Sequence, residues 1–217
     1  MDMKRLFNIL TRVAPFILLF LSCNKDITKT SQPEYFPNTI GDFWQYQVTD
    51  SSQSSPNNPS APIRYSVSVN ITGIKTLLDG KDATIWQYQY PWGNDTNYVR
   101  VTGDTIKIFD LTYSRSLSDL NYPRLVFLPP FQVNQSWDGN LLDIDSYTVI
   151  HQADINTGSQ TFMGCYDINY QYSGPNMEVN DHYWFKPFVG MVSMYSNHYL
   201  NGPNTYRTWQ LTRYYTQ

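Results

Sequence analysis

The strongest constraint on the fold is an alternation of apolar and polar side chains with a period of two residues. Between residues 65 and 71 the two kinds alternate strictly, beginning at Tyr65 and ending at Ile71. Trp86, Tyr88 and Tyr90 repeat the pattern with a glutamine after each of the first two. Because neighbouring side chains of a strand point to opposite faces, this spacing predicts half-buried β-strands.

Turn signals separate these strands at short intervals. Asp79-Gly80 and Gly103-Asp104 each follow one predicted strand and precede another, and Asn156-Thr157-Gly158 does the same nearer the C-terminus. Roughly ten to twelve short strands of this kind predict an all-β domain. We expect an antiparallel meander that forms a strongly curved sheet or a partly closed barrel. Residues 111–122 are the one stretch in this region where we expect a helical turn.

The first 22 residues have the pattern of a signal peptide. Lys4, Arg5 and Arg12 give a basic start, and an apolar run at residues 13–21 ends just before Ser22 and Cys23. That run is shorter than the roughly 20 apolar residues of a membrane-spanning helix. An ordinary secretory signal cleaved elsewhere and a retained anchor are the alternatives. The predicted organisation is therefore a signal peptide at 1–22, a tether at 23–34 and a single antiparallel β domain at 35–217.

Phe20-Leu21-Ser22-Cys23 resembles the lipobox of bacterial lipoproteins. The resemblance implies that Cys23 is lipidated with fatty acids such as palmitate and that the preceding peptide is removed. Several acyl chains would hold the protein firmly on a membrane. Asn24-Lys25-Asp26 partly resembles a surface-export tag of some Gram-negative lipoproteins. We therefore expect a lipid-anchored protein of the outer membrane, on its periplasmic face or on the cell surface.

The charge of the mature chain excludes one class of partner. Removing 22 of 217 residues leaves 195, with 12 of the 15 lysines and arginines and 17 of the 18 aspartates and glutamates. This net negative charge argues against nucleic acid as a partner. Frequent Tyr and Trp together with scarce Glu favour strands over helices.

Cysteine usage leaves one thiol in the mature domain. If Cys23 is acylated, Cys165 has no partner for an intramolecular disulfide. Cys165 lies in an apolar patch of a predicted strand, without a neighbouring group that would lower its pKa. We expect it to be buried and inert rather than a nucleophile.

The sequence offers few groups for catalysis, and we expect no enzymatic activity. The three histidines, His151, His182 and His198, form no metal-binding or catalytic motif, and no phosphate-binding loop is present. Asp181 and His182 are adjacent and would face opposite sides of a strand. We therefore expect no cofactor and no metal site. The alternative is a hydrolase whose two carboxylates are far apart in the sequence.

Two further patterns have both a structural and a functional interpretation. Asp138, Asp143 and Asp145 could supply oxygen ligands to Ca²⁺, but the loop lacks the spacing of an EF-hand, which favours a solvated acidic loop. Most of the six tryptophans are expected to fill the core, Trp184 and Trp209 among them. Trp92 is the exception because it lies in a turn-like segment, which makes it a weak candidate for ligand binding.

Segments at both ends of the domain resemble a group of uncharacterised Gram-negative lipoproteins. The resemblance is carried by residues 35–46, with Gly41-Asp42-Phe43-Trp44, by residues 184–192, and by Leu211-Thr212-Arg213-Tyr214. The resemblance implies an all-β domain and a location in the cell envelope, and it implies no particular activity. We expect a binding or structural lipoprotein whose ligand is a glycan, a lipid or an envelope protein. A concave apolar sheet would favour a lipid, whereas a flat surface with exposed Trp would favour a glycan.

Overall fold

The structure, a computed structural model, describes residues 36–52, 61–110, 119–121, 123–139, 144–200 and 204–217. The chain divides into two compact units, Met1–Pro33 and Glu34–Gln217, and every described residue belongs to the second. The predicted signal peptide, the tether and Cys23 lie outside the described residues. In the part of the chain that is described, no helix is both long and apolar enough to cross a membrane.

The described residues form β-strands and one short 3₁₀ helix, η1 (Asp119–Asn121), and no α-helix occurs among them. The strands are β1 (Phe43–Ser52), β2 (Ile63–Thr76), β3 (Asp82–Tyr90), β4 (Gly93–Thr102), β5 (Thr105–Asp110), β6 (Leu125–Phe127), β7 (Ser136–Asp138), β8 (Asp145–Asn156), β9 (Thr161–Gly174), β10 (Met177–Lys186), β11 (Gly190–Leu200) and β12 (Thr205–Tyr215).

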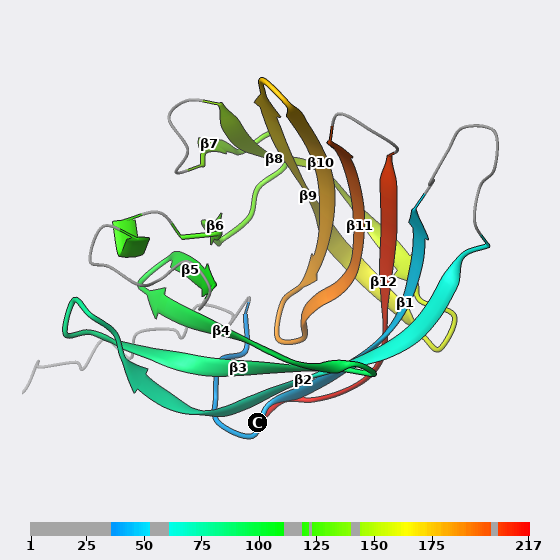
Figure 1. The fold of residues 1–217 in the computed structure, drawn as a ribbon. Helices are drawn as coiled ribbons and strands as arrows, with labels where there is room; N and C mark the ends of the chain where they lie inside the picture. The colour runs from blue at the N-terminus through cyan, green and yellow to red at the C-terminus, as the bar shows by residue number, and fades with distance from the viewer. Residues whose placement is uncertain (1–35, 53–60, 111–118, 122, 140–143, 201–203) are drawn as a thin grey trace, which may run out of the picture. The chain divides into compact units, whose positions relative to one another are not determined.

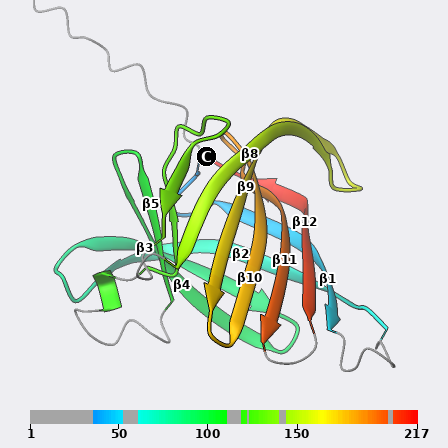
Figure 2. The same cartoon turned by 90° about the horizontal axis from the view of Figure 1, so that it is seen from above.

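All twelve strands form one antiparallel sheet in the order β6-β5-β4-β3-β2-β1-β12-β11-β10-β9-β8-β7. The first and last strands of the chain therefore pair at its centre, where Trp44 lies opposite Tyr214 and Val48 opposite Trp209. Figures 1 and 2 show the sheet bending strongly, so that β3 to β5 and β9 to β11 lie on opposite arms of the curve. The predicted all-β, curved antiparallel meander is confirmed.

The two edges of the sheet are its shortest strands, β6 and β7, and no backbone ladder joins them in the described residues. Side chains span the gap instead. The indole N–H of Trp137 on β7 donates a 3.0 Å hydrogen bond to the carbonyl of Val126 on β6. The amide N–H of Val126 donates to the Tyr147 hydroxyl on β8 at 3.4 Å. In the described residues the sheet does not close through backbone hydrogen bonds, and these side-chain bonds hold its two edges together.

The inner face of the curve carries the main hydrophobic core, as the alternation in sequence predicts. Val67, Val69 and Ile71 on β2 are buried and share that face with Trp86 of β3. Residues 2 apart lie on one face of a strand, so each strand contributes every second side chain to the core. Removing this apolar area from water stabilises the fold by about 25 cal/mol per Å².

A second, smaller cluster lies on the outer face. Phe109 and Tyr98 alternate with the inner-face residues of β5 and β4, and they pack with Leu77, Ala83 and Leu120. Leu120 belongs to η1, so this single 3₁₀ turn covers apolar side chains that the sheet would otherwise expose. It falls within the stretch where a helical turn was expected, of which residues 111–118 and 122 lie outside the described residues.

The predicted turns are confirmed where the chain is described. Gly80 follows β2 and Gly158 follows β8, and both have positive φ angles, 73° and 82°. Glycine adopts this left-handed region without the clash between Cβ and the backbone that other residues incur. Asp-Gly and Thr-Gly at these positions therefore allow the chain to reverse between antiparallel strands.

Candidate ligand-binding cavity

A cavity of about 130 Å³ lies within the inner face of the sheet. Its walls come from both halves of the sheet, β1 to β6 on one side and β10 to β12 on the other. Ten of the lining side chains are aromatic: Phe36, Trp44, Tyr46, Trp86, Tyr88, Tyr90, Phe127, Tyr183, Phe185 and Trp209. Met191, Met194, Val69, Ile108 and Leu125 add aliphatic surface.

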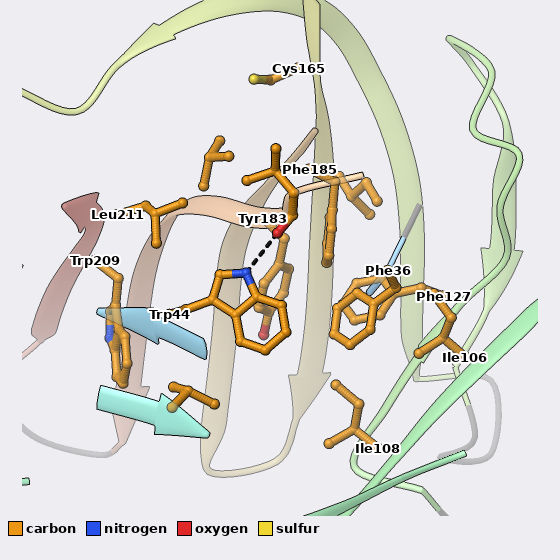
Figure 3. Packing of buried hydrophobic residues seen from close by; sticks show 14 of the residues in the cluster. Phe36, Trp44, Ile106, Ile108, Phe127, Cys165, Tyr183, Phe185, Trp209 and Leu211 are labelled. Carbon is orange, nitrogen blue, oxygen red and sulfur yellow. Dashed lines mark hydrogen bonds between the residues drawn. The ribbon is translucent and has the colours of Figure 1, made fainter. Parts of the chain in front are cut away.

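Stacked rings form the rigid side of this cavity. Trp44 and Trp86 stack with centroids 4.9 Å apart and planes 15° from parallel, and Phe36 stacks on the other face of the group at 4.8 Å from Trp86. Phe127 meets Phe185 edge to face at 4.8 Å. Such aromatic pairs contribute about 0.5–1.5 kcal/mol each beyond the area they bury. Figure 3 shows how Trp44, Phe36 and Phe127 cluster in the core.

Most buried indole N–H groups in this core have an acceptor. Trp44 donates to the carbonyl of Val189 at 2.6 Å, a bond drawn in Figure 3. Trp86 donates to the side-chain oxygen of Asn38 at 2.8 Å, and Trp137 donates to Val126 as described above. The indole nitrogen of Trp209 is buried and has no hydrogen-bond partner among the described residues.

One wall of the cavity is polar. Asp95 and Asn97 point from β4 to the inner face, next to Tyr88 of β3. Asn97 is buried and hydrogen-bonds the Tyr88 hydroxyl, but its side-chain oxygen has no partner among the described residues. Arg124 also lines the cavity and forms an ion pair with Asp110 at 3.4 Å. The cavity thus combines apolar walls with a small number of polar groups, as ligand sites do.

The tyrosines of the cavity stay neutral across the physiological range. Burial is the largest cause that raises the pKa of Tyr46, Tyr88 and Tyr90 above the ordinary value of tyrosine. Desolvation disfavours the charged phenolate, so these hydroxyls remain protonated. They therefore act as hydrogen-bonding groups and not as bases.

Trp92 lies beside the cavity rather than in it. Its side chain is 68% exposed at the turn between β3 and β4. It stacks on Tyr90 at 5.5 Å and meets Tyr65 edge to face at 4.7 Å. Because Tyr90 lines the cavity, Trp92 extends the aromatic surface outward from its wall. Trp92 therefore lies in a turn, as its sequence context indicated, and its role in ligand binding stays a prediction.

The other tryptophans divide as their strands dictate. Trp44, Trp86, Trp137 and Trp209 are buried, as predicted for core residues. The prediction that Trp184 is a core residue is wrong. Trp184 alternates with the buried Tyr183 and Phe185, so it lies half-buried on the outer face. There it meets the ring of His151 at 5.2 Å.

A second polar group lies on the inner face near one edge of the sheet. Tyr183 donates to Asp181 at 3.1 Å, and Tyr170 donates to Asp145 at 3.5 Å. Both carboxylates contribute to raising the pKa of Tyr170, after burial, which is the largest cause. The fold therefore brings two aspartates that are distant in sequence into one cluster, of which Tyr183 also lines the cavity.

His198 joins this cluster without completing a catalytic triad. Its Nε2 atom lies 2.9 Å from the Ser196 hydroxyl and 3.0 Å from Asp181. In a Ser-His-Asp triad the serine and the carboxylate contact opposite ring nitrogens, so that one holds the ring while the other accepts the proton. Here one nitrogen makes both contacts, so His198 does not connect them in that way.

His182 lies on the outer face, and both of its ring nitrogens have partners. Its Nδ1 atom lies 3.0 Å from Asp167, and its Nε2 atom lies 3.2 Å from the Asn169 amide. Asp181 is the next residue before it and faces the inner side, which confirms the predicted opposition of the pair. The Asp167 hydrogen bond is the largest cause that raises the pKa of His182.

Cys165 is fully buried, and its thiol donates to the carbonyl of Phe162 at 3.3 Å. Burial is the largest cause that raises the pKa of this thiol to about 11. A group that stays protonated at neutral pH is a poor nucleophile. The predicted burial of Cys165 is confirmed.

The predicted acidic loop is only partly solvated. Asp138 is exposed, Asp143 lies outside the described residues, and Asp145 is buried at the start of β8. The prediction is therefore wrong for Asp145, because its strand directs the carboxylate toward Tyr170. Among the described residues, no three His, Cys, Asp or Glu side chains form a group that could hold a metal ion.

Sequence reasoning missed the polar residues of the cavity. Asn97 and Arg124 carry no motif, and both line the cavity because β4 and β6, which Arg124 directly precedes, flank β5 in the sheet. The period-two pattern indicated that Trp86, Tyr88 and Tyr90 share a face, which is confirmed. It did not indicate that Trp209, from the last strand, faces the same space.

No protein-family model matches the chain, and no curated protein sequence matches it. Among solved structures it is similar to a protein of Bacteroides fragilis described as exported and as having a YmcC-like fold, with 13% identity, a TM-score of 0.47, and coverage of 85% of this chain and 100% of the other. It is also similar to a protein of Parabacteroides distasonis described as a lipoprotein, with 15% identity, a TM-score of 0.46, and coverage of 86% and 100%.

A DUF1329 family protein of Desulfovibrio piger is similar at 10% identity and a TM-score of 0.25, with coverage of 79% of this chain and 85% of the other. With every TM-score below 0.5, neither the fold described above nor the function proposed below depends on these likenesses.

Proposed function

We propose that the protein is a non-catalytic binding lipoprotein of the cell envelope that holds a small, mostly apolar molecule in its inner-face cavity. The observation that carries the proposal is the cavity itself, about 130 Å³ lined mainly by aromatic and aliphatic side chains. Protein interiors contain few voids larger than a water molecule. A space of this size among stacked rings is therefore a place that a ligand would complete.

The size of the cavity limits the ligand. A water molecule needs roughly 10–15 Å³ of such volume. The cavity thus accommodates a compact molecule of on the order of ten non-hydrogen atoms, or an acyl segment of similar size. A glycan would need exposed rings on a flat surface. Trp92 is the most exposed of the six tryptophans, and in the described residues its ring stacks on Tyr90 and meets Tyr65 edge to face.

The proposed location rests on the sequence. The basic start, the apolar run and Cys23 support a lipid anchor in the outer membrane. The domain would lie on the periplasmic face of that membrane or on the cell surface. The membrane would then be a partner through the anchor, and the cavity would take a molecule from the envelope. The net negative charge of the mature chain supports the expectation that nucleic acid is not a partner.

The alternative function is a hydrolase that uses Asp145 and Asp181. The observation in its favour is that both carboxylates lie close enough to Tyr170 to contribute to raising its pKa. Two observations favour binding instead: a tyrosine hydroxyl donates to each carboxylate, and His198 contacts Ser196 and Asp181 through one nitrogen. Product release that is lost in Asp181→Asn would support the hydrolase.

Methionine methyl NMR tests the binding proposal. Met191 and Met194 line the cavity, whereas Met163 is 61% exposed on β9 and serves as an internal reference. The full chain, purified as the cell produces it and kept in lipid nanodiscs, is labelled at the methionine methyl groups. Benzamide, acetophenone and cumene, which share a benzene ring, are titrated separately. We expect at least one of them to shift Met191 and Met194 saturably and to leave Met163 unchanged.

The matched control fills the cavity. Ile108 lines it from β5, so Ile108→Phe adds volume where a ligand would lie. This variant should keep the dispersion of the native spectrum and lose the saturable shifts. Equal shifts at Met163, or saturable binding that persists unchanged in Ile108→Phe, would contradict the proposal.

A further inference from the structure

Two residues that line the cavity each carry a buried polar atom without a hydrogen-bond partner among the described residues. The side-chain oxygen of Asn97 can only accept a hydrogen bond, and the indole nitrogen of Trp209 can only donate one. Both side chains are more than nine-tenths buried, and neither atom has a hydrogen-bond partner among the described residues. Asn97 and Trp209 both line the cavity.

Such atoms are unusual in a native core. Leaving a buried donor or acceptor unsatisfied costs the desolvation of that group, so more than nine in ten are paired. The indoles of Trp44, Trp86 and Trp137 in the same core all have acceptors.

Three buried side-chain atoms lack a partner among the described residues, and two of them, on Asn97 and Trp209, belong to residues that line the cavity. The third belongs to Asp50, whose other carboxylate oxygen is paired with Arg207. We infer that the missing partners of Asn97 and Trp209 come from whatever occupies the cavity.

The two atoms lie on different halves of the sheet. Asn97 is on β4 and Trp209 is on β12, with β3, β2 and β1 between them in the sheet order. Hydrogen bonds to both therefore require groups on one molecule that spans part of the cavity, or on two separate molecules. We propose that the ligand is an uncharged amphiphile that presents a hydrogen-bond donor to Asn97 and an acceptor to Trp209, as a primary amide or an alcohol does.

The charges near Asn97 define the polar end further. Asp95 lines the same wall, and the guanidinium of Arg124 is paired with the carboxylate of Asp110. Because Arg124 is already paired, the carboxylate of Asp95 is the charge on this wall that a bound group would meet. A carboxylate ligand would be repelled there and could not donate to Asn97. The proposal therefore selects a neutral donor over a fatty-acid head group.

This inference rests on the proposed function, and four probes of matched shape separate the two. Benzamide carries a donor and an acceptor, acetophenone an acceptor only, cumene neither, and benzoate a negative charge. Binding is followed by the methyl shifts of Met191 and Met194. Asn97→Leu keeps the side-chain size. It should weaken the binding of benzamide by about tenfold and change the affinities for acetophenone and cumene by no more than about twofold.

Two further variants make the test specific. Trp209→Phe removes the indole donor. It should weaken the binding of benzamide and of acetophenone by about tenfold each, and the binding of cumene much less. Tyr88→Phe removes the hydroxyl that Asn97 also contacts and should preserve the discrimination between probes. Benzoate should bind at least about tenfold more weakly than benzamide.

Each outcome decides one of the two proposals. Binding of cumene and benzamide that responds equally to Asn97→Leu would overturn the inference about the polar end and leave the binding proposal standing. Tight binding of benzoate would also overturn it. Failure of all four probes to shift Met191 or Met194 would contradict the proposed function itself. Asn97→Leu and Trp209→Phe act on different strands, so misfolding of one leaves the other to decide.

Discussion

The indole of Trp137 and the carbonyl of Val126 join the two edges of the sheet through one hydrogen bond of 3.0 Å. The edge strands β6 and β7 have three residues each and share no ladder. Unpaired strand edges are sites where sheets pair with other chains. Short edges tied by a buried side chain limit that hazard here.

We predict that Trp137→Phe lowers the free energy of unfolding by about 1–3 kcal/mol, because it removes this bond and leaves a buried carbonyl without its donor. Denaturant unfolding of the purified protein measures the change. The matched control is Trp209→Phe, which removes an indole N–H that has no partner in the described residues. Similar losses in the two variants would mean that ring size, and not the bond, determines the effect.

The two tryptophans that were expected in the core should respond differently to truncation. Trp209→Ala removes a buried aromatic side chain and should cost about 3–5 kcal/mol. Trp184 is half-buried on the outer face, so Trp184→Ala should cost clearly less. Thermal and denaturant unfolding of both variants compares them. Equal destabilisation would contradict the assignment of Trp184 to the outer face.

Cys165 should resist thiol reagents in the folded protein. Burial raises its pKa to about 11, so at pH 8 the reactive thiolate is a minor species and the sulfur is also covered. We expect labelling by a chromogenic disulfide reagent to be slow in buffer and fast in denaturant. Cys165→Ala provides the blank. Rapid stoichiometric labelling of the native protein would show an accessible, activated thiol.

His182 should make stability depend on pH. Its pKa is raised in the folded state, chiefly by the hydrogen bond that its Nδ1–H donates to the carboxylate of Asp167. A raised pKa means that the folded protein binds the proton more tightly than the unfolded chain does. The stabilisation is therefore fully present below the unfolded pKa of about 6.5 and is lost as pH rises through the folded pKa.

His182→Gln should remove this component while keeping a polar side chain. We expect the urea midpoint of the native protein to fall between pH 5.5 and 8.5 by more than that of the variant. His151 lies 3.7 Å from the same carboxylate, so His151→Gln is the matched control for other titrating groups near Asp167. A pH dependence that is unchanged in His182→Gln would assign the effect elsewhere.

Cys23 should be the site of lipid attachment. Cells fed a labelled fatty acid should label the wild-type protein and fail to label Cys23→Ala. Cys165→Ala serves as the matched control because it removes the other cysteine of the chain without touching the lipobox. Equal incorporation into the wild type and Cys23→Ala would exclude Cys23 as the attachment site.

Local signals in the sequence predicted the strands but not their arrangement across the sheet. The alternation from Tyr65 to Ile71 and the glycine at position 80 each reflect the geometry of a few neighbouring residues, and both are confirmed. Pairing of β1 with β12 depends on residues at opposite ends of the domain. A period of two residues carries no information on which strands become neighbours.

The cavity was unpredictable for the same reason. Its aromatic residues were expected in the core, and Trp86 and Trp209 are indeed buried. Whether such rings fill the space between two halves of a sheet depends on the curvature of that sheet. Asn97 resembles any other strand residue in sequence, and only its surroundings reveal that its oxygen lacks a partner in the described part of the chain.

The central pairing of β1 with β12 also determines when the domain can finish folding. Phe43 pairs with Tyr215, so the innermost ladder of the sheet joins residues from opposite ends of the domain. Contacts between residues this far apart form slowly, because a long loop must close before they contribute. Until β12 pairs, no ladder joins the meander of β1 to β6 to that of β7 to β11, and β1 and β11 each present an open edge. The domain is therefore completed as one sheet only when β12 inserts between them.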